Sequence, residues 1–270
     1  MKYMRVISDQ TGPQGMYGVF RGEEVYLLND TPLSTSAKET GVAFPLREVK
    51  VFLPPVEAPN IIALGQNYLE HAKESKLEPP TAPVIFFKST SSLTGHLNPI
   101  VLPAEAPSQV DYEAELTVVI GKKCKHVPLE KAKDVIFGYT CGQDVSARDC
   151  QVKLDRQWAR GKSFDTFTPI GPVIETELNP DNLRIQLKLN GKTMQDGRTR
   201  DLIFSVFHVV SYLSRQMTLL PGTLIMTGTP SGIGFSRKPP IFLKPGDRVE
   251  VAIEGIGVFE NSVVMENYRG

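Results

Sequence analysis

The sequence predicts a mainly β protein with a few short helices, an α+β fold whose mixed sheets form a sandwich or roll. Composition is the first observation, because 22 glycines and 21 prolines spread over 270 residues favour many short strands and turns. The second is pattern, since short runs of alternating apolar and polar residues recur, most clearly over 111–120. The third is length: with 41% hydrophobic residues, the chain can bury one large core and a small appendage.

Composition also excludes several classes of protein. Thirty Lys and Arg balance thirty Asp and Glu, and no basic block predicts a nucleic-acid partner. Apolar runs such as 84–87 fall far short of the roughly 20 residues of a membrane helix, and the first twelve residues lack the apolar core of a secretory signal. Three cysteines without metal-type spacing indicate free thiols in a reducing compartment. We therefore expect a soluble, cytoplasmic protein without a membrane or nucleic-acid partner.

The first fifty residues predict a small β module. Strand patterns cover 4–7, 16–20 and 24–28, and a turn at 21–23 joins the last two. The proline-rich segment 52–59 then marks a boundary. We expect a module at 1–55 and a larger, catalytic domain at 56–270.

Short strands and short helices alternate in the larger domain. Strand patterns cover 60–64, 84–87, 100–102, 138–141, 170–175, 184–190 and 223–227, and a turn at Glu254-Gly255 joins two closing strands. Helical patterns cover 67–76, 129–137 and 203–213. Ser146 and Asp149 have the spacing of a capping box, which predicts a helix through about Gln157. Asn190-Gly191 is a strong hairpin signal.

Acidic residues interrupt the strand pattern of 111–120. Glu113 and Glu115 project from one face because successive side chains of a strand alternate, and Asp144 ends another strand. Neighbouring carboxylates suit a hard cation, which takes oxygen ligands. A half-solvated strand with two exposed charges would give the same pattern.

Two further segments suggest chemistry. His71 and Glu74 stand three residues apart on a predicted helix, where a carboxylate can orient an imidazole as a general base. An ordinary surface pair has the same spacing. The segment 77–83 suits a mobile flap or a plain loop. The loop Gly228–Gly234 lacks phosphate-loop and dinucleotide motifs, but its amides suit a carboxylate or an oxyanion.

The order of these motifs resembles the fumarylacetoacetate hydrolase superfamily. Over about residues 58–264, the family's order and spacing are matched by GQNYLEHAKE, FFKSTSSLTG, DYEAELTVVIGK, GQDVSARD, W-x-x-x-K-S-F-D, LLPGTLIMTGTPSGIG and LKPGDRVEVAIEGIG. The resemblance implies that family's mixed β-sandwich or roll, and a homodimer. The N-terminal module resembles the one that precedes the catalytic domain in bacterial-type members.

The resemblance implies a metal site. Glu113, Glu115 and Asp144 would bind one Mg²⁺ or Mn²⁺, which a 2-oxo or enol acid would chelate through a carboxylate and its keto oxygen. Electrostatics agrees, because two carboxylates 4 Å apart repel by about 4 kcal/mol at an effective dielectric of 20. Three converging carboxylates therefore need a cation.

The resemblance also implies roles for other side chains. His71 and Glu74 match a catalytic dyad on a closing lid, and Lys162 would donate to the developing oxyanion or enolate. Substrate-pocket positions are matched by Arg148, Gln151, Thr229 and Gly228. For Arg148, a structural salt bridge fits as well as direct contact with substrate.

The expected activity is C–C bond hydrolysis or decarboxylation of an acylpyruvate or oxaloacetate through a metal-stabilised enolate. One alternative is an isomerase or tautomerase of oxaloacetate or of 2-hydroxyhepta-2,4-diene-1,7-dioate, and another is a non-catalytic ligand-binding protein of the same fold. Gln66 and Gln143 depart from the family pattern and would reshape the surroundings of the site. If Arg198 and Arg200 reach the pocket, they favour a dicarboxylate substrate.

Overall fold

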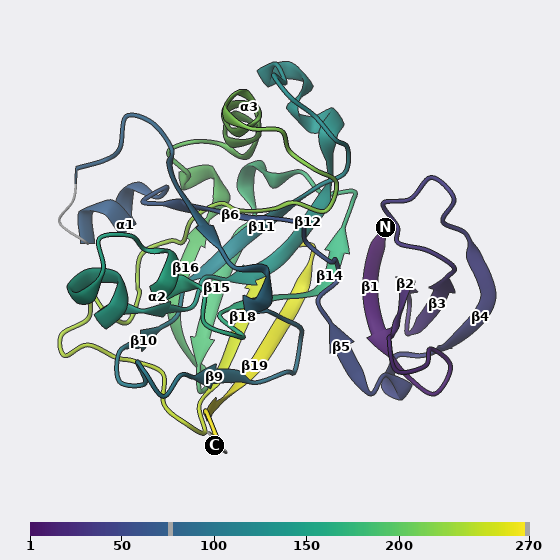
Figure 1. Ribbon diagram of the computed structural model, residues 1–270, viewed down its shortest axis with the longest axis horizontal. Helices are drawn as coiled ribbons and strands as arrows, with labels where there is room; N and C mark the ends of the chain where they lie inside the picture. The colour runs from purple at the N-terminus through teal and green to yellow at the C-terminus, as the bar shows by residue number, and fades with distance from the viewer. Residues whose placement is uncertain (75–77, 268–270) are drawn as a thin grey trace.

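A large mixed sheet forms the framework of the molecule. The computed structural model describes residues 1–74 and 78–267. Within them, twelve strands form one sheet whose main path is β4-β3-β2-β1-β14-β12-β11-β17-β6-β7, with β5 beside β1 and β8 beside β14 (Figure 1). These strands are β1 Lys2–Ile7, β2 Met16–Arg21, β3 Glu24–Leu28, β4 Glu39–Pro45, β5 Val51–Leu53, β6 Ile61–Gly65, β7 Val84–Lys88, β8 Leu93–Thr94, β11 Ala114–Ile120, β12 Ile136–Gln143, β14 Thr168–Glu175 and β17 Leu224–Met226.

A second sheet packs against the middle of the first. Its order is β16-β15-β18-β19-β9, and its strands are β9 Ile100–Leu102, β15 Arg184–Leu189, β16 Lys192–Arg198, β18 Arg248–Ile253 and β19 Gly257–Met265. β11, β12 and β14 lie against β15, β18 and β19, and the core between them includes the buried Leu116, Ile185 and Phe259. A short pair, β10 Val110–Asp111 and β13 Ser146–Ala147, stands apart from both sheets. The predicted mainly β, mixed-sheet fold is confirmed.

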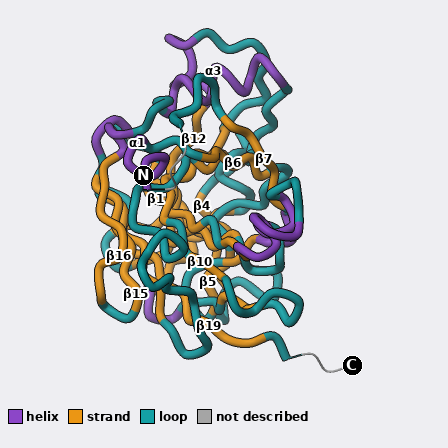
Figure 2. Tube along the Cα trace, turned by 90° about the vertical axis from the view of Figure 1, so that its left-hand side faces the viewer, coloured by secondary structure: helices purple, strands orange, loops and turns teal. Residues whose placement is uncertain are grey.

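Helices are short and lie around the outside of the strands (Figure 2). The α-helices are α1 Leu69–Glu74, α2 Ala159–Lys162 and α3 Val206–Gln216. Short 3-10 helices cover Leu46–Glu48, Thr90–Ser92, Leu129–Val135, Pro180–Asn182 and Thr199–Asp201, and a π-helix covers Asp149–Leu154. Among the described residues, no helix combines the length and the apolar character needed to cross a membrane.

Two helix predictions are corrected by the structure. The predicted helix from Ser146 is wrong at its start, because Ser146 and Ala147 pair with β10 as β13, and the Ser146 hydroxyl donates to the Asp144 carbonyl at 2.9 Å. The π-helix begins only at Asp149. The segment predicted as a helix over 129–137 becomes strand β12 from Ile136 onwards. Of the helix predicted over 67–76, residues 75 and 76 lie outside the described residues.

The N-terminal strands continue the large sheet rather than forming a sheet of their own. β1 pairs antiparallel with β14 through Lys2 and Glu175 and through Tyr3 and Ile174. β14 pairs in turn with β12, the strand that leads directly to Asp144. Paired strands therefore join the N-terminal strands to the acidic centre without a break.

Candidate active site

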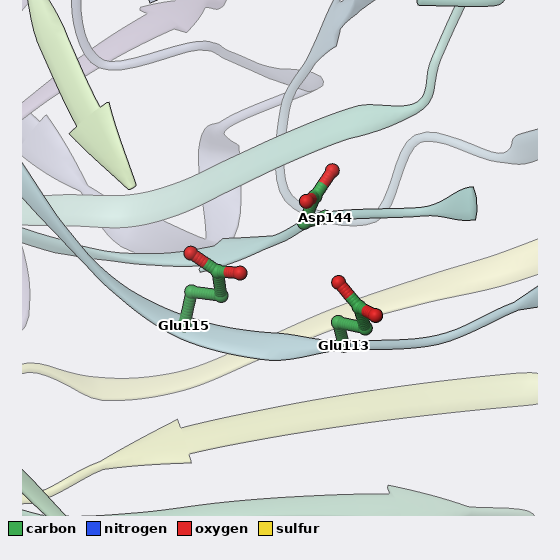
Figure 3. Close-up of side chains that lie close together, drawn as sticks. All are labelled: Glu113, Glu115 and Asp144. Atoms are coloured by element: carbon green, nitrogen blue, oxygen red, sulfur yellow. The ribbon is translucent and has the colours of Figure 1, made fainter. Parts of the chain in front are cut away.

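Two adjacent strands bring the three predicted acids together. β11 and β12 are antiparallel, with Ala114 opposite Gln143, and the Asp144 amide donates to the Glu113 carbonyl at 2.9 Å. This register sets Glu113 and Glu115 beside Asp144 (Figure 3). All three side chains are buried, and one carboxylate oxygen from each lies within 4.8 Å of the others.

Three buried cations surround this acidic cluster. Lys162, at the end of α2, donates to Glu113 Oε2 at 2.8 Å and to Asp144 Oδ2 at 2.6 Å. Arg148 Nη2 donates to Glu113 Oε1 at 2.5 Å. Lys88, at the end of β7, donates to Asp144 and to the Phe167 carbonyl, the latter at 2.8 Å. The sequence reasoning missed Lys88, although a lysine that closes the apolar run 84–87 was a usable signal.

The electrostatic surroundings of Glu113 and Glu115 shift the pKa values of their carboxyl groups in opposite directions. Burial alone would raise the pKa of Glu113, but Lys162 and Arg148 hold it well below its ordinary value. Burial and the neighbouring Asp144 and Glu113 raise the pKa of Glu115 well above its ordinary value. Glu115 accepts a hydrogen bond from the Gly228 amide at 2.8 Å, and no Lys or Arg of the described chain lies within 4.0 Å of its carboxylate. A further positive charge is therefore missing beside Glu115.

The donor set fits a hard divalent cation. Glu113, Glu115 and Asp144 offer three oxygen ligands at a spacing that lets one ion contact all of them. The uncompensated carboxylate of Glu115 is the observation that calls for such an ion, because a buried charge without a partner is strongly unfavourable.

Asp111 ties Arg148 to the glycine-rich loop. This buried carboxylate accepts from Arg148 Nε at 3.0 Å and Nη2 at 2.8 Å, and from the amides of Gly234 and Phe235 at 2.8 and 2.9 Å. Arg148 Nη1 donates to Gln151 Oε1 at 2.7 Å. Arg148 thus has the structural salt bridge that the sequence left open. Asp111 itself was missed, although it alternates with Glu113 and Glu115.

The predicted dyad is anchored to the same loop. His71 Nδ1 lies 3.0 Å from Glu74 Oε1, and the two oxygens of Glu74 accept from the Gly232 amide at 3.1 and 3.0 Å. Gly232 has φ +105°, and a Cβ there would lie 2.2 Å from the Met194 carbonyl oxygen. The close approach that holds Glu74 therefore requires glycine. In the same loop, the Thr229 hydroxyl donates to the Ala114 carbonyl at 2.8 Å.

Most of the predicted site residues line one cavity of about 450 Å³. Its walls include His71, Glu74, Glu113, Glu115, Asp144, Arg148, Gln151, Lys162, Thr229 and Gln66. Gly228 is not in its walls and contacts the site through Glu115. Gln143 is also outside the walls, and its buried amide has no hydrogen-bond partner among the described residues.

The two arginines of the 198–200 segment do not reach this cavity. Arg198 donates to the Asn182 carbonyl at 3.1 Å and lies 3.7 Å from Glu254, while Arg200 lies 3.7 Å from Asp201. Neither is among the described residues that form the cavity walls. The expectation of a dicarboxylate substrate drawn from them therefore loses its basis.

Comparison with protein families agrees with this fold and site. A family model described as Fumarylacetoacetate (FAA) hydrolase C-terminal matches residues 60–264, and one described as Rv2993c-like, N-terminal matches residues 1–55. Together the fold and the site define an enzyme of the fumarylacetoacetate hydrolase type. The chain belongs to the fumarylacetoacetate hydrolase family, which confirms the resemblance.

Relatives named for an enzymatic activity are similar to this protein over most of the chain. The mitochondrial oxaloacetate tautomerase FAHD2A of Homo sapiens is 41% identical over 242 residues, which are 87% of this chain and 77% of that protein. The crystal structure of 2-hydroxyhepta-2,4-diene-1,7-dioate isomerase from Mycobacterium marinum is 40% identical, with a TM-score of 0.86 over 99% of this chain and 100% of that one. That of 5-carboxymethyl-2-hydroxymuconate delta-isomerase from Mycobacterium smegmatis is 39% identical, with a TM-score of 0.87 over 98% and 100%.

Proposed function

We propose that this protein is a divalent-metal-dependent tautomerase or isomerase of small 2-oxo acids, which moves a proton between C3 and the adjacent carbonyl oxygen. The observation that carries the proposal is that one cavity holds both the acidic triad and the His71–Glu74 pair. The activities for which these relatives are named are isomerisations, and this supports placing proton transfer ahead of bond cleavage. This order reverses the expectation from sequence.

Different side chains of the site would have different roles in the proton transfer. Mg²⁺ or Mn²⁺, held by Glu113, Glu115 and Asp144, would supply a Lewis acid for the keto oxygen. Glu74 holds His71 through Nδ1, which leaves Nε2 to take a proton from C3 and deliver it to the carbonyl oxygen, or to carry out the reverse transfer. Lys162 supplies a buried positive charge, since Asp144 and Glu113 outweigh burial and raise its pKa.

Hydrolysis or decarboxylation remains the second candidate. The specific observation that favours it is that the same His71–Glu74 pair faces a cavity large enough for a water molecule beside the substrate. In hydrolysis, His71 would deprotonate that water, which would attack the distal carbonyl of an acylpyruvate and release pyruvate. In decarboxylation, oxaloacetate would lose CO₂ and His71 would protonate the product at C3.

The proposal is tested by incubating the enzyme with oxaloacetate in the presence of Mg²⁺, Mn²⁺ or EDTA. The ultraviolet absorbance of the enol and the release of pyruvate are both measured. We expect the enol–keto conversion to accelerate with metal, without pyruvate beyond the non-enzymatic rate. His71→Gln should lower kcat about 100-fold, within the range for loss of a general base. Stoichiometric pyruvate from oxaloacetate or acetylpyruvate would replace the proposal with the second candidate. Metal binding without turnover of any tested 2-oxo acid would favour the ligand-binding alternative.

We also propose a homodimer and a cytoplasmic location, both from the sequence. The dimer rests on the family resemblance, and light scattering coupled to size-exclusion chromatography tests it. The location rests on the three free cysteines, of which Cys141 and Cys150 are buried. The human relative is named as a mitochondrial protein.

A further inference from the structure

The cavity walls combine charged and apolar side chains. Lys162 Nζ lies 5.3 Å from the centre of the Phe86 ring, and Arg148 Cζ lies 5.8 Å from the centre of the Phe235 ring. The apolar side chains, which together form the apolar wall, are Leu64, Phe86, Trp158, Ile233, Phe235 and Val152. Trp158 meets Phe86 edge-on at 5.5 Å, and its ring packs so closely on Gly65 that a Cβ there would lie 2.4 Å from it. The aromatic part of this wall is therefore fixed by packing.

The cations in the cavity walls are already paired with protein carboxylates. Among the described residues that line the cavity, the Lys and Arg side chains are Arg148 and Lys162. Arg148 is bound by Asp111 and Glu113, and Lys162 by Glu113 and Asp144. A second substrate carboxylate would compete with these partners for the same hydrogen bonds.

Two neutral amides, Gln66 and Gln151, are among the other polar groups of the cavity walls, together with the hydroxyls of Thr229 and Ser236. Gln66 lines the cavity with φ +57°, a left-handed conformation that is unfavourable for a residue other than glycine. Gln151 accepts from Arg148 through Oε1, which leaves its Nε2 as a donor. Gln66 and Gln151 can donate to an uncharged oxygen, but they add no positive charge.

The volume of the cavity also favours a substrate with a larger apolar group. At about 450 Å³ the cavity lies within the range of about 300–1,000 Å³ for sites that bind drug-sized ligands, and a four-carbon acid fills little of it. Val152 and Phe235, which are 58% and 38% exposed, extend the apolar wall to the surface. A larger apolar group attached to C3 would cover these side chains.

We propose that the site prefers 2-oxo acids whose C3 carries an uncharged aryl or alkyl group over those whose C3 carries a carboxylate. This preference rests on the proposed function, since it concerns the same proton transfer from C3 to the carbonyl oxygen with no other atom gained or lost. Apolar groups gain by leaving water for the Trp158 and Val152 wall, whereas a carboxylate there loses hydration without gaining a partner.

The experiment compares phenylpyruvate with oxaloacetate, which differ only in the phenyl or carboxylate group on C3. Enol–keto conversion of each is followed by ultraviolet absorbance with Mg²⁺ and with Mn²⁺, and non-enzymatic rates are subtracted. We expect kcat/KM for phenylpyruvate to exceed that for oxaloacetate at least tenfold. A ratio of one or less, with both substrates turned over, would overturn the preference and leave the proposed function intact. Turnover of neither would overturn the proposed function.

A matched pair of exposed positions tests where the preference arises. Val152 lines the cavity, whereas Leu154, 67% exposed on the same π-helix, does not. Val152→Arg should lower the phenylpyruvate-to-oxaloacetate ratio at least tenfold, and Leu154→Arg, with the same change of charge, should keep it within twofold. An equal effect of both substitutions, or none from Val152→Arg in a folded protein, would contradict the proposal. Trp158→Ala should lower the ratio mainly by raising KM for phenylpyruvate.

Discussion

Each buried acid at the centre of the molecule has a different set of partners. Asp111 is bound by Arg148 and two amides, Glu113 by Lys162 and Arg148, and Asp144 by Lys88 and Lys162. Glu115 is bound by the Gly228 amide. Its charge is therefore the least compensated of the four, and without metal it opposes folding.

Glu115→Gln should consequently have opposite effects with and without metal. In EDTA we expect the variant to unfold about 2–4 °C higher than the wild type, because the loss of about 1 kcal/mol of repulsion shifts Tm by that amount in a domain of this size. In excess Mn²⁺ the order should reverse, since only the wild type gains stability by binding.

Differential scanning fluorimetry with and without Mn²⁺ measures both effects. Glu130→Gln, at an exposed glutamate remote from the cavity walls, controls for the loss of a negative charge. An identical Mn²⁺-dependent shift in wild type and Glu115→Gln would show that Glu115 is not a ligand.

The site residues that the sequence did not predict are those whose contacts are made with residues far away in the chain. The alternation of Glu113 and Glu115 and the strand end at Asp144 were visible in the sequence, and the dyad spacing was too. Lys88 contacts Asp144 across 56 positions, and no local pattern encodes a pairing at that separation. Whether Arg198 and Arg200 reach the pocket could not be predicted for the related reason that their direction depends on how the end of β16 and the following 3-10 helix pack.

The glycine-rich loop links the dyad to the acidic centre. Gly232 holds Glu74, while Gly234 and Phe235 hold Asp111, which in turn holds Arg148. The loop therefore fixes two sides of the cavity by backbone amides. Because these donors are backbone amides, their positions depend on the backbone conformation of the loop and not on side-chain rotamers.

Gly232→Ala should impair catalysis more than folding. A Cβ at 2.2 Å from the Met194 carbonyl oxygen must displace the loop, and a displacement of about 1 Å at a general base can cost about 100-fold in rate. We expect kcat to fall at least tenfold. Gly246→Ala is the matched control, because Gly246 also has a positive φ, +90°, but has open space around its Cβ position.

Steady-state kinetics and Tm of both glycine variants distinguish the mechanisms. If Gly246→Ala lowers kcat as much as Gly232→Ala does, then backbone strain in general is responsible and the loop has no special role.

The segment 146–157 shows why some elements resist prediction. Its capping-box pattern is a local signal for a helix, but the pairing of Ser146 with Asp111 and the hydrogen bond to the Asp144 carbonyl use the same groups in a strand. Elements whose signals agree with their surroundings were predicted well. The Asn190-Gly191 hairpin is an example, with φ of 51° and 78° at its two central residues.

The large sheet contains strands from both sides of the predicted domain boundary at residues 52–59. β1 pairs with β14 on the far side of that boundary, and Ile174 of β14 is completely buried. The sequence could indicate a module of short strands, since its alternation and turns are local. It gave no register for β1 against a strand about 170 residues away.

We expect the N-terminal strands and the remainder to unfold together. Scanning calorimetry in EDTA should show one transition with equal calorimetric and van't Hoff enthalpies, because breaking the β1–β14 pairing exposes buried apolar surface on both sides. Two separated transitions would instead support a module at 1–55 that folds by itself.

The central place of β11 has a consequence for how the site exchanges its contents. Every residue of β11 is buried, and the strand is hydrogen-bonded to β12 on one side and β17 on the other. Fraying therefore cannot free Glu115, whose strand opens only when much of the sheet opens. Val152 and Phe235 are cavity-wall residues that are exposed to solvent, so we expect an ion or a product to be exchanged on their side of the cavity. The π-helix and the glycine-rich loop, and not the strand that carries Glu115, therefore border the expected route of exchange.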